Sequence, residues 1–157
     1  MGNAAVLRTL AIRRAKPSDL DALVDLELRA FSGDRLSRRQ FRRHLRSDSV
    51  AVLVARDADR LLGDAVVFFR RDSAVARLYS LVSAPQARGR GLGRALLAAA
   101  EREARRRHCR SMRLEVRADN PDAIDLYERN GYARIGRKPG YYEDGADAWR
   151  YQKELGA

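Results

Sequence analysis

Two kinds of hydrophobic periodicity follow one another along this chain. Short segments in which apolar residues alternate with polar ones, or run together, predict β-strands. Those segments are Leu7 to Arg14, Val50 to Ala55, Leu61 to Phe69, Val75 to Val82, Ser111 to Val116, Tyr132 to Gly136 and Ala148 to Lys153. Turn-forming residues separate several of them, so we expect some neighbouring strands to pair as hairpins.

Apolar residues spaced by three and four predict helices between these strands. The helical segments are residues 17–31, a short helix after Ser37, residues 91–107 and residues 121–130. Pro17 opens the first helix, and Ser37 with Gln40 three residues later forms a capping box for the second. Asn120 is a helix cap before the last helix, and Gly131 ends it.

The predicted order of elements is βααβββαβαββ, without an internal repeat, linker or low-complexity tract. Three consecutive strands favour antiparallel pairing, whereas a strand, helix and strand in succession require a parallel crossover. We therefore expect one α/β domain over residues 1–157. Its sheet is mixed and mostly antiparallel, with helices on both faces.

The composition agrees with a globular domain: 45% of the 157 residues are hydrophobic and 34% are charged. Apolar stretches such as Ala65 to Phe69 are much shorter than the ~20 residues of a membrane helix. The N-terminal residues lack a basic region followed by an apolar run, so we expect a cytoplasmic protein. Cys109, the single cysteine, is expected to be a core or surface thiol, and no metal site is expected.

The chain carries a formal net charge of +11, and all but three of its 32 basic residues are arginines. The densest group, which we call the arginine patch, consists of Arg35, Arg38, Arg39, Arg42, Arg43 and Arg46. This patch can recruit an acidic acceptor, contact a ribosome or nucleic acid, or be a solvated helix face. A basic module that binds nucleic acid without catalysis is therefore an alternative class, but interleaved aromatics and a recognition-helix motif are missing.

A glycine-rich stretch lies between the predicted strand at residues 75–82 and the helix at residues 91–107. Its glycines stand at alternate positions and are flanked by arginines: Arg88, Gly89, Arg90, Gly91, Leu92, Gly93 and Arg94. Free N–H groups at a helix start, together with guanidinium groups, suit the binding of a diphosphate. The alternative is an ordinary glycine-rich turn that binds no ligand. The stretch fits neither of two other phosphate-binding motifs. A dinucleotide fingerprint would need glycine in place of Arg94, and a P-loop would need lysine there, followed by serine or threonine.

The run from Arg88 to Gly93, followed by Ala-Leu-Leu, resembles the acetyl-CoA loop of the GNAT superfamily of N-acetyltransferases. The segment from Leu114 to Tyr132 resembles the second cofactor segment of that superfamily, and is most similar to its ribosomal-protein alanine N-acetyltransferase subgroup. The tail from Tyr141 to Ala148 is similar to the same subgroup. Ser83 departs from the pattern, since family members usually have an aliphatic residue there.

This resemblance implies an enzyme that transfers the acetyl group of acetyl-CoA directly to a primary amine. The acceptor favoured by the tail is a protein or peptide N-terminal amine, with a lysine or a small-molecule amine as alternatives. In the family, the strand before the loop splays from its neighbour and binds the pantetheine arm. The cofactor-binding residues implied here are Leu81, Val82, Ser83, the loop residues 88–94 and Asn120, with an N–H near Val82 polarising the thioester carbonyl.

The resemblance also implies two catalytic residues. Glu115 resembles the general base of the subgroup, acting directly or through water; alternatively, it is a strand carboxylate paired with Arg113 and Arg117 on the same strand face. Tyr127 resembles the tyrosine that donates a proton or hydrogen bond to the CoA sulfur; alternatively, it is a core aromatic residue. Tyr141 and Tyr142 are expected to line the acceptor pocket, or else to pack on the sheet as loop aromatics.

Overall fold

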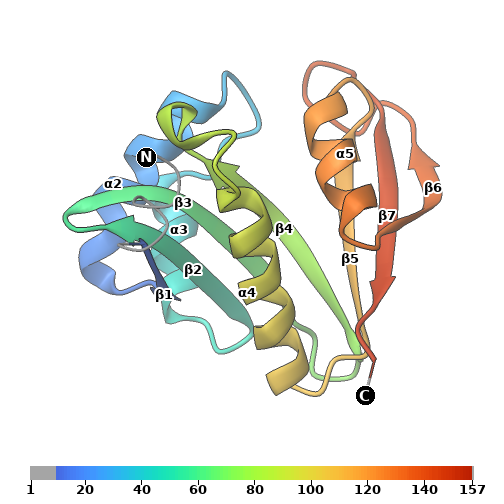
Figure 1. The fold of residues 1–157 in the computed structure, drawn as a ribbon, viewed down its shortest axis with the longest axis horizontal. Coiled ribbons are helices and arrows are strands. Elements are labelled where there is room, and N and C mark those ends of the chain that lie inside the picture. Colours follow the sequence, from blue (N-terminus) through green and yellow to red (C-terminus); the bar gives the residue numbers. More distant parts are fainter. Residues whose placement is uncertain (1–9, 157) are drawn as a thin grey trace.

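The structure, a computed structural model, describes residues 10–156, whose strands form one seven-stranded sheet (Figure 1). The strands are β1 Leu10–Arg14, β2 Val50–Asp57, β3 Arg60–Phe68, β4 Val75–Ser83, β5 Ser111–Arg117, β6 Ala133–Lys138 and β7 Ala148–Glu154. Their order in the sheet is β1-β2-β3-β4-β5-β7-β6. Only the pair of β4 and β5 is parallel among these strands, which confirms the predicted mixed, mostly antiparallel sheet.

Helices cover both faces of the sheet, as predicted. The α-helices are α2 Leu20–Ala30, α3 Arg38–Arg46, α4 Leu92–Arg106 and α5 Pro121–Arg129, and short 3₁₀ turns lie at η1 Pro17–Asp19 and η2 Pro85–Ala87. In Figure 1, α4 crosses in front of β3 and β4 and α5 lies in front of β5 and β7, whereas α2 and α3 lie behind the sheet. The apolar core between these layers includes Cys109, so of the two expected places for this thiol, core or surface, the structure shows the core.

The predicted helix caps are present. The side chain of Ser37 accepts a hydrogen bond from the backbone N–H of Gln40, and the Gln40 side chain accepts one from the Ser37 N–H. Asn120 accepts a hydrogen bond from the N–H of Ala123 at the start of α5. Each cap satisfies an N–H group that the first turn of a helix leaves without a partner.

The first predicted helix, residues 17–31, begins differently in the structure. Residues 17–19 form the 3₁₀ turn η1 instead of the first turn of α2. The buried carboxylate of Asp19 accepts a hydrogen bond from the Lys16 N–H at 2.7 Å and pairs with Arg13 and Arg56 at 2.8 and 3.1 Å. These contacts hold a tight turn that joins η1 to β1 and β2. Residues 7–9 of the first predicted strand lie outside the described residues.

The most important feature for function is the divergence of β4 and β5. The two strands pair only along Val75–Leu78 and Ser111–Leu114. Beyond these residues β4 continues beside β3 to Ser83, and β5 continues beside β7 to Arg117. Figure 1 shows the two strands separating toward the end where α4 begins. The outer part of β4 therefore has a strand on one edge only.

A buried acid in β3 leads to a prediction about stability. Asp64 is fully buried, and neither carboxylate oxygen has a hydrogen-bond partner among the described residues. Burial, reinforced by the nearby charge of Glu27, raises the pKa of Asp64 well above its usual range. The folded protein therefore keeps a proton at pH values where the unfolded chain has lost it. Its free energy of unfolding falls as the pH rises from about 4 toward the raised pKa.

Asp64→Asn removes this titration and keeps the size of the side chain. We expect the parent to lose stability relative to the variant as the pH rises, by about 1.4 kcal/mol for each unit by which the pKa is raised. Urea unfolding of both proteins between about pH 4.5 and 8 measures the difference. Parallel stability curves over that interval would contradict the assignment.

Candidate active site

The divergence of β4 and β5 opens a cavity of about 920 Å³. Its wall comes from five parts of the chain: the end of α2 with the loop after it, residues 77–81 of β4, residues 115–117 of β5, the start of α5, and residues 141–144 after β6. Strand β5 presents Glu115 on one face and Val116 on the other, and both reach the cavity. The cavity therefore spans both faces of the sheet.

The structure brings together most of the side chains that the sequence predicted. The cavity wall contains Leu81, Glu115, Asn120, Tyr127, Tyr141 and Tyr142. Val82 is buried and Ser83 half-buried at the end of β4, and neither lies in this wall. The glycine-rich loop at residues 88–94 is outside the wall as well, at the start of α4. Within residues 10–156, no group of His, Cys, Asp or Glu side chains could hold a metal ion.

The loop before α4 has the backbone of an anion cradle. Gly89 and Gly91 have φ angles of 78° and 77°, a left-handed conformation that favours glycine. Gly91 is the N-cap of α4, and no side chain caps this helix. The N–H groups of residues 92–94 consequently lack acceptors inside the helix. Gly93 differs from the other two because it lies within α4, where a Cβ would come 3.2 Å from Leu126.

The arginines of this loop add positive charge to the cradle. None of Arg88, Arg90 and Arg94 forms an ion pair with another residue of the described chain. Backbone N–H groups and unpaired guanidinium groups fit the diphosphate of acetyl-CoA. The unpaired edge of β4 beyond Leu78 leads from the cavity toward this loop, which suits an extended pantetheine arm.

Glu115 is held between two arginines. Its side chain is 4% exposed, and its Oε1 and Oε2 accept hydrogen bonds from Arg77 at 2.6 Å and Arg150 at 2.9 Å. The hydroxyl of Tyr141 lies 3.5 Å from Oε1 and accepts a hydrogen bond from Arg77 at 2.7 Å. Oε1 therefore lies near two donors, whereas Oε2 accepts one hydrogen bond and keeps a lone pair that can take a proton directly or through a water molecule.

The expected pairing of Glu115 with Arg113 and Arg117 is wrong. Arg113 donates to Gln152, and Arg117 pairs with Asp119 and Asp144. Residues two apart on a strand share a face, but the residue directly opposite on the next strand is nearer, and Arg150 occupies that position. The alternation correctly predicted the face of Glu115 and not its partners.

Tyr127 is nearly buried on α5 and lies in the cavity wall. Its ring contacts Tyr132 edge to face, with 5.8 Å between the ring centroids. Burial raises the pKa of the Tyr127 hydroxyl, so the group keeps its proton at neutral pH. The residue therefore combines core packing with a phenol that faces the cavity. Asn120 likewise combines a helix cap with a place in the wall.

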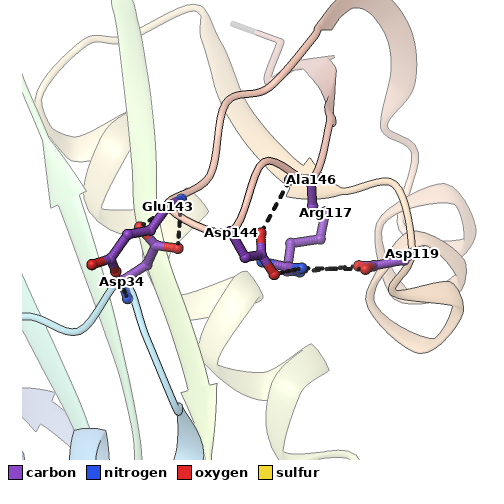
Figure 2. A network of polar contacts seen from close by, with 6 residues as sticks. All are labelled: Asp34, Arg117, Asp119, Glu143, Asp144 and Ala146. Atoms are coloured by element: carbon purple, nitrogen blue, oxygen red, sulfur yellow. Dashed lines mark hydrogen bonds and ion pairs between the residues drawn. The ribbon is translucent and has the colours of Figure 1, made fainter.

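Two loops close the cavity opposite α5, and they supply residues that the sequence did not indicate. Figure 2 shows Asp34, which follows α2, beside Glu143, which follows β6. The N–H of Asp34 donates to Glu143 Oε2 at 3.0 Å, and the N–H of Glu143 donates to Asp34 Oδ2 at 3.2 Å. The loop after β6 also carries Tyr142, and the centre of its ring lies 4.9 Å from the guanidinium of Arg117. The contacts between Asp34 and Glu143 join residues 109 positions apart, which no local pattern can indicate.

The arginine patch lies apart from the cavity. Arg39, Arg42, Arg43 and Arg46 surround a shallow hollow of about 430 Å³ that shares no residue with the cavity wall. Arg38 pairs with Asp21, and the Arg35 guanidinium donates to the Phe31 carbonyl. Recruitment of a partner by this patch stays a prediction.

The family follows from comparison with known proteins. The model of the acetyltransferase (GNAT) family matches residues 20–132. The chain belongs to this family. The match extends beyond the two cofactor segments to α2, α3, β2 and β3.

Individual relatives agree with this assignment. The chain is 32% identical over 143 residues to the N-alpha-acetyltransferase RimI of Mycobacterium tuberculosis, a match that covers 88% of this chain and 89% of that protein. It is 34% identical over 149 residues to an uncharacterized protein of Mycobacterium leprae, with 92% of this chain but only 41% of that protein covered. The chain thus spans less than half the length of this second relative.

Among solved structures, the fold resembles the ribosomal-protein-S18-alanine N-acetyltransferase of Escherichia coli. The TM-score is 0.85 at 26% sequence identity, with 94% of this chain and 95% of the other covered. This similarity confirms the predicted fold and the predicted subgroup resemblance. Within the described residues, no helix is long and apolar enough to cross a membrane.

Proposed function

We propose that this GNAT protein transfers the acetyl group of acetyl-CoA to the N-terminal amine of a protein or peptide. The observation that carries the proposal is the cavity between β4 and β5, which has Glu115 on one side and Tyr127 on another. The acceptor amine and the thioester must meet where one protein group can accept a proton and another can donate one. This cavity supplies both groups.

The binding of acetyl-CoA is assigned to residues at the start of α4 and the end of β4. Loop residues 88–94 hold the diphosphate, and the free edge of Leu81, Val82 and Ser83 aligns the pantetheine arm like an added strand. Asn120 contacts that arm from the start of α5. When bound, acetyl-CoA supplies an activated acyl group, and an N–H near Val82 polarises its carbonyl oxygen.

Proton transfer is assigned to the two catalytic residues. Glu115 takes the proton of the acceptor ammonium, directly or through water, while Arg77 and Arg150 hold its carboxylate in place. Tyr127 donates a hydrogen bond or proton to the sulfur that leaves. Tyr141 and Tyr142 line the part of the cavity that receives the acceptor.

The names of the relatives support a peptide N-terminus as acceptor. The Mycobacterium tuberculosis protein is an N-alpha-acetyltransferase, and the Escherichia coli protein acetylates an alanine of a ribosomal protein. A lysine side chain or a small-molecule amine presents the same attacking nitrogen, so the acceptor needs a direct test.

An assay of CoA release with a thiol reagent provides that test. We expect turnover with a short peptide that has a free N-terminal amine and an internal lysine, and none with the same peptide blocked at its N-terminus. Mass spectrometry of the product locates the acetyl group. Acetylation of the lysine in both peptides would contradict the N-terminal assignment. Turnover with small amines alone would show that the acceptor is a small-molecule amine and not a peptide.

Glu115→Gln is expected to lower kcat roughly tenfold. This loss is smaller than the ~100-fold typical of a positioned base because solvent water can accept the ammonium proton in place of Glu115. We also expect the pH profile of kcat to move to higher pH in the variant. Steady-state kinetics over a range of pH measures both effects.

Glu101→Gln is the matched control for this variant. Glu101 is also a buried carboxylate, bonded to Tyr132 at 2.9 Å and Lys153 at 3.0 Å, but it lies outside the cavity. Equal losses of kcat in the two variants would assign Glu115 a structural role.

A further inference from the structure

The outer face of α3 carries a row of four arginines. Arg39, Arg42, Arg43 and Arg46 are all exposed, and together with Ser47 they surround the hollow of about 430 Å³ described above. We call it the arginine hollow. Residues three and four positions apart share one side of a helix, so the four side chains lie along a single line. Seven residues of helix rise by about 10 Å, which is the length of this row.

The opposite side of α3 holds the helix in place. Phe41 is fully buried, and Leu45 packs against the apolar core. The capping contacts between Ser37 and Gln40 fix the start of the helix. The row of arginines is therefore carried by an element whose position is set by packing.

The positive charge of this row is not compensated by nearby acids. None of the four arginines forms an ion pair with a residue between positions 10 and 156. The sequence has no acidic residue between Asp34 and Asp48. A general excess of arginine in the composition explains the number of these residues, but not that they gather on one helix face without acids.

The stability of α3 does not explain the row either. Like charges four positions apart repel one another, as in the pairs Arg39 with Arg43 and Arg42 with Arg46. Arg39 also lies in the first turn, at the positive end of the helix dipole, whereas Arg43 and Arg46 suit the negative end. The arrangement therefore costs the helix some stability, and a bound polyanion would remove the repulsion.

The residues around the hollow indicate which polyanion fits. The lining consists of arginines and one serine, without the apolar core that a protein partner usually contacts. A helix that lies on a membrane inserts an apolar face, but here that face is buried in the protein. Phosphate groups need only cations and hydrogen-bond donors, which guanidinium groups supply as bidentate pairs.

The shape of the site favours a single strand over a duplex. Duplexes are read by an element that protrudes into a groove, whereas a shallow hollow can receive one flexible strand. A row of about 10 Å matches about three consecutive phosphates of one strand. Single-stranded segments are characteristic of RNA.

We propose that the arginine hollow binds the phosphodiester backbone of single-stranded RNA. The contacts are made to phosphates, so they carry affinity without reading the base sequence. The hollow shares no residue with the cavity between β4 and β5, and the inference does not rest on the proposed acetylation.

Fluorescence anisotropy with a labelled oligouridylate of 12 nucleotides, which has no stable secondary structure, tests the inference. CoA is present throughout to occupy the proposed diphosphate loop, whose arginines also attract phosphate. We expect binding at low salt that weakens as salt is added. A plot of log K against log salt concentration should have a slope of about −2, the value for about three phosphate contacts in a single strand.

The double variant Arg42→Gln, Arg46→Gln removes two of these contacts. We expect it to bind the oligouridylate roughly five- to tenfold more weakly at low salt, the range for two exposed ion pairs. The salt slope should become shallower by about 1.4. Because the substitutions relieve repulsion within α3, the variant should unfold at the same temperature as the parent or higher, which circular dichroism measures.

The double variant Arg102→Gln, Arg110→Gln is the matched control. Both arginines are exposed, lie outside the hollow and form no ion pair with another described residue, so the net charge changes by the same amount. This control should keep the affinity and the salt slope of the parent. Equal losses in the two double variants would overturn the placement of the site on α3.

Three further outcomes would overturn the inference. The first is a parent protein that does not bind the oligouridylate at low salt. The second is tighter binding of a duplex RNA of the same length, which would replace the single strand. The third is tighter binding of polyglutamate or of vesicles with anionic lipid, which would make the partner an acidic protein or a membrane surface. The assay of CoA release tests the proposed acetylation separately, so either conclusion can fail without the other.

Discussion

Gly91→Asp is expected to lower the affinity for acetyl-CoA by at least about 100-fold. Gly91 is the N-cap of α4, and a side chain there points into open space beside the N–H groups that bind the diphosphate. A carboxylate about 4 Å from a phosphate charge costs about 4 kcal/mol near a protein surface, which corresponds to a loss of this size or larger. Isothermal titration with acetyl-CoA measures the affinity.

Gly91→Asn is the matched control for this substitution. The φ angle of 77° at this position strains most side chains, but aspartate and asparagine tolerate it about equally. Both also stabilise a helix as N-caps, so unfolding does not explain a difference between them. We expect the asparagine variant to lose much less affinity than the aspartate variant. Equal affinities of the parent and both variants for acetyl-CoA would show that the diphosphate does not bind at this loop.

Tyr127→Phe is expected to lower kcat about 100-fold and to leave the dissociation constant of acetyl-CoA nearly unchanged. Phenylalanine keeps the ring and its edge contact with Tyr132, and deletes only the hydroxyl that is proposed to assist the leaving sulfur. The loss should be smaller with an acyl donor whose leaving thiol is more acidic, because such a thiolate needs less protonation. Steady-state kinetics with the two donors, together with calorimetry, measures these effects.

Tyr132→Phe provides the control for the loss of a buried hydroxyl. The Tyr132 hydroxyl donates a hydrogen bond to Glu101 at 2.9 Å, and the residue lies outside the cavity. This variant should lose stability and keep kcat. A folded Tyr127→Phe variant with the kcat of the parent would make Tyr127 a packing residue, with the proton supplied by water or by the acceptor.

Much of the fold could be predicted from local patterns. Alternation and helical spacing indicated every strand and α-helix of the described chain, with ends that shift by a few residues. The capping box at Ser37 and the cap at Asn120 are contacts within a single turn, so the residues that form them can be recognised in the sequence. The 3₁₀ turn before α2 was not predicted. It is held by the Asp19 side chain, which contacts Lys16 and Arg13 nearby and also Arg56, 37 residues away.

The candidate site was predictable to the extent that its residues belong to continuous motifs. The loop at residues 88–94 is proposed to bind through its own backbone and its own arginines, so this proposal could be made without a structure. Glu115 and Tyr127 were predicted through resemblance to a family, and the structure brings both into one cavity. Their roles in catalysis stay predictions that the variants above test.

The sequence by itself determined the order of elements, the mixed sheet, the face on which Glu115 lies and the glycine-rich loop that is proposed to bind the diphosphate, because each depends on residues close together in the chain. Only the tertiary structure decided which groups surround Glu115 and which loops close the cavity. Arg150 reaches Glu115 across neighbouring strands, and Asp34 meets Glu143 across 109 residues. Periodicity specifies the face on which a side chain lies, but its neighbours depend on strand register and loop packing, which are properties of the whole fold.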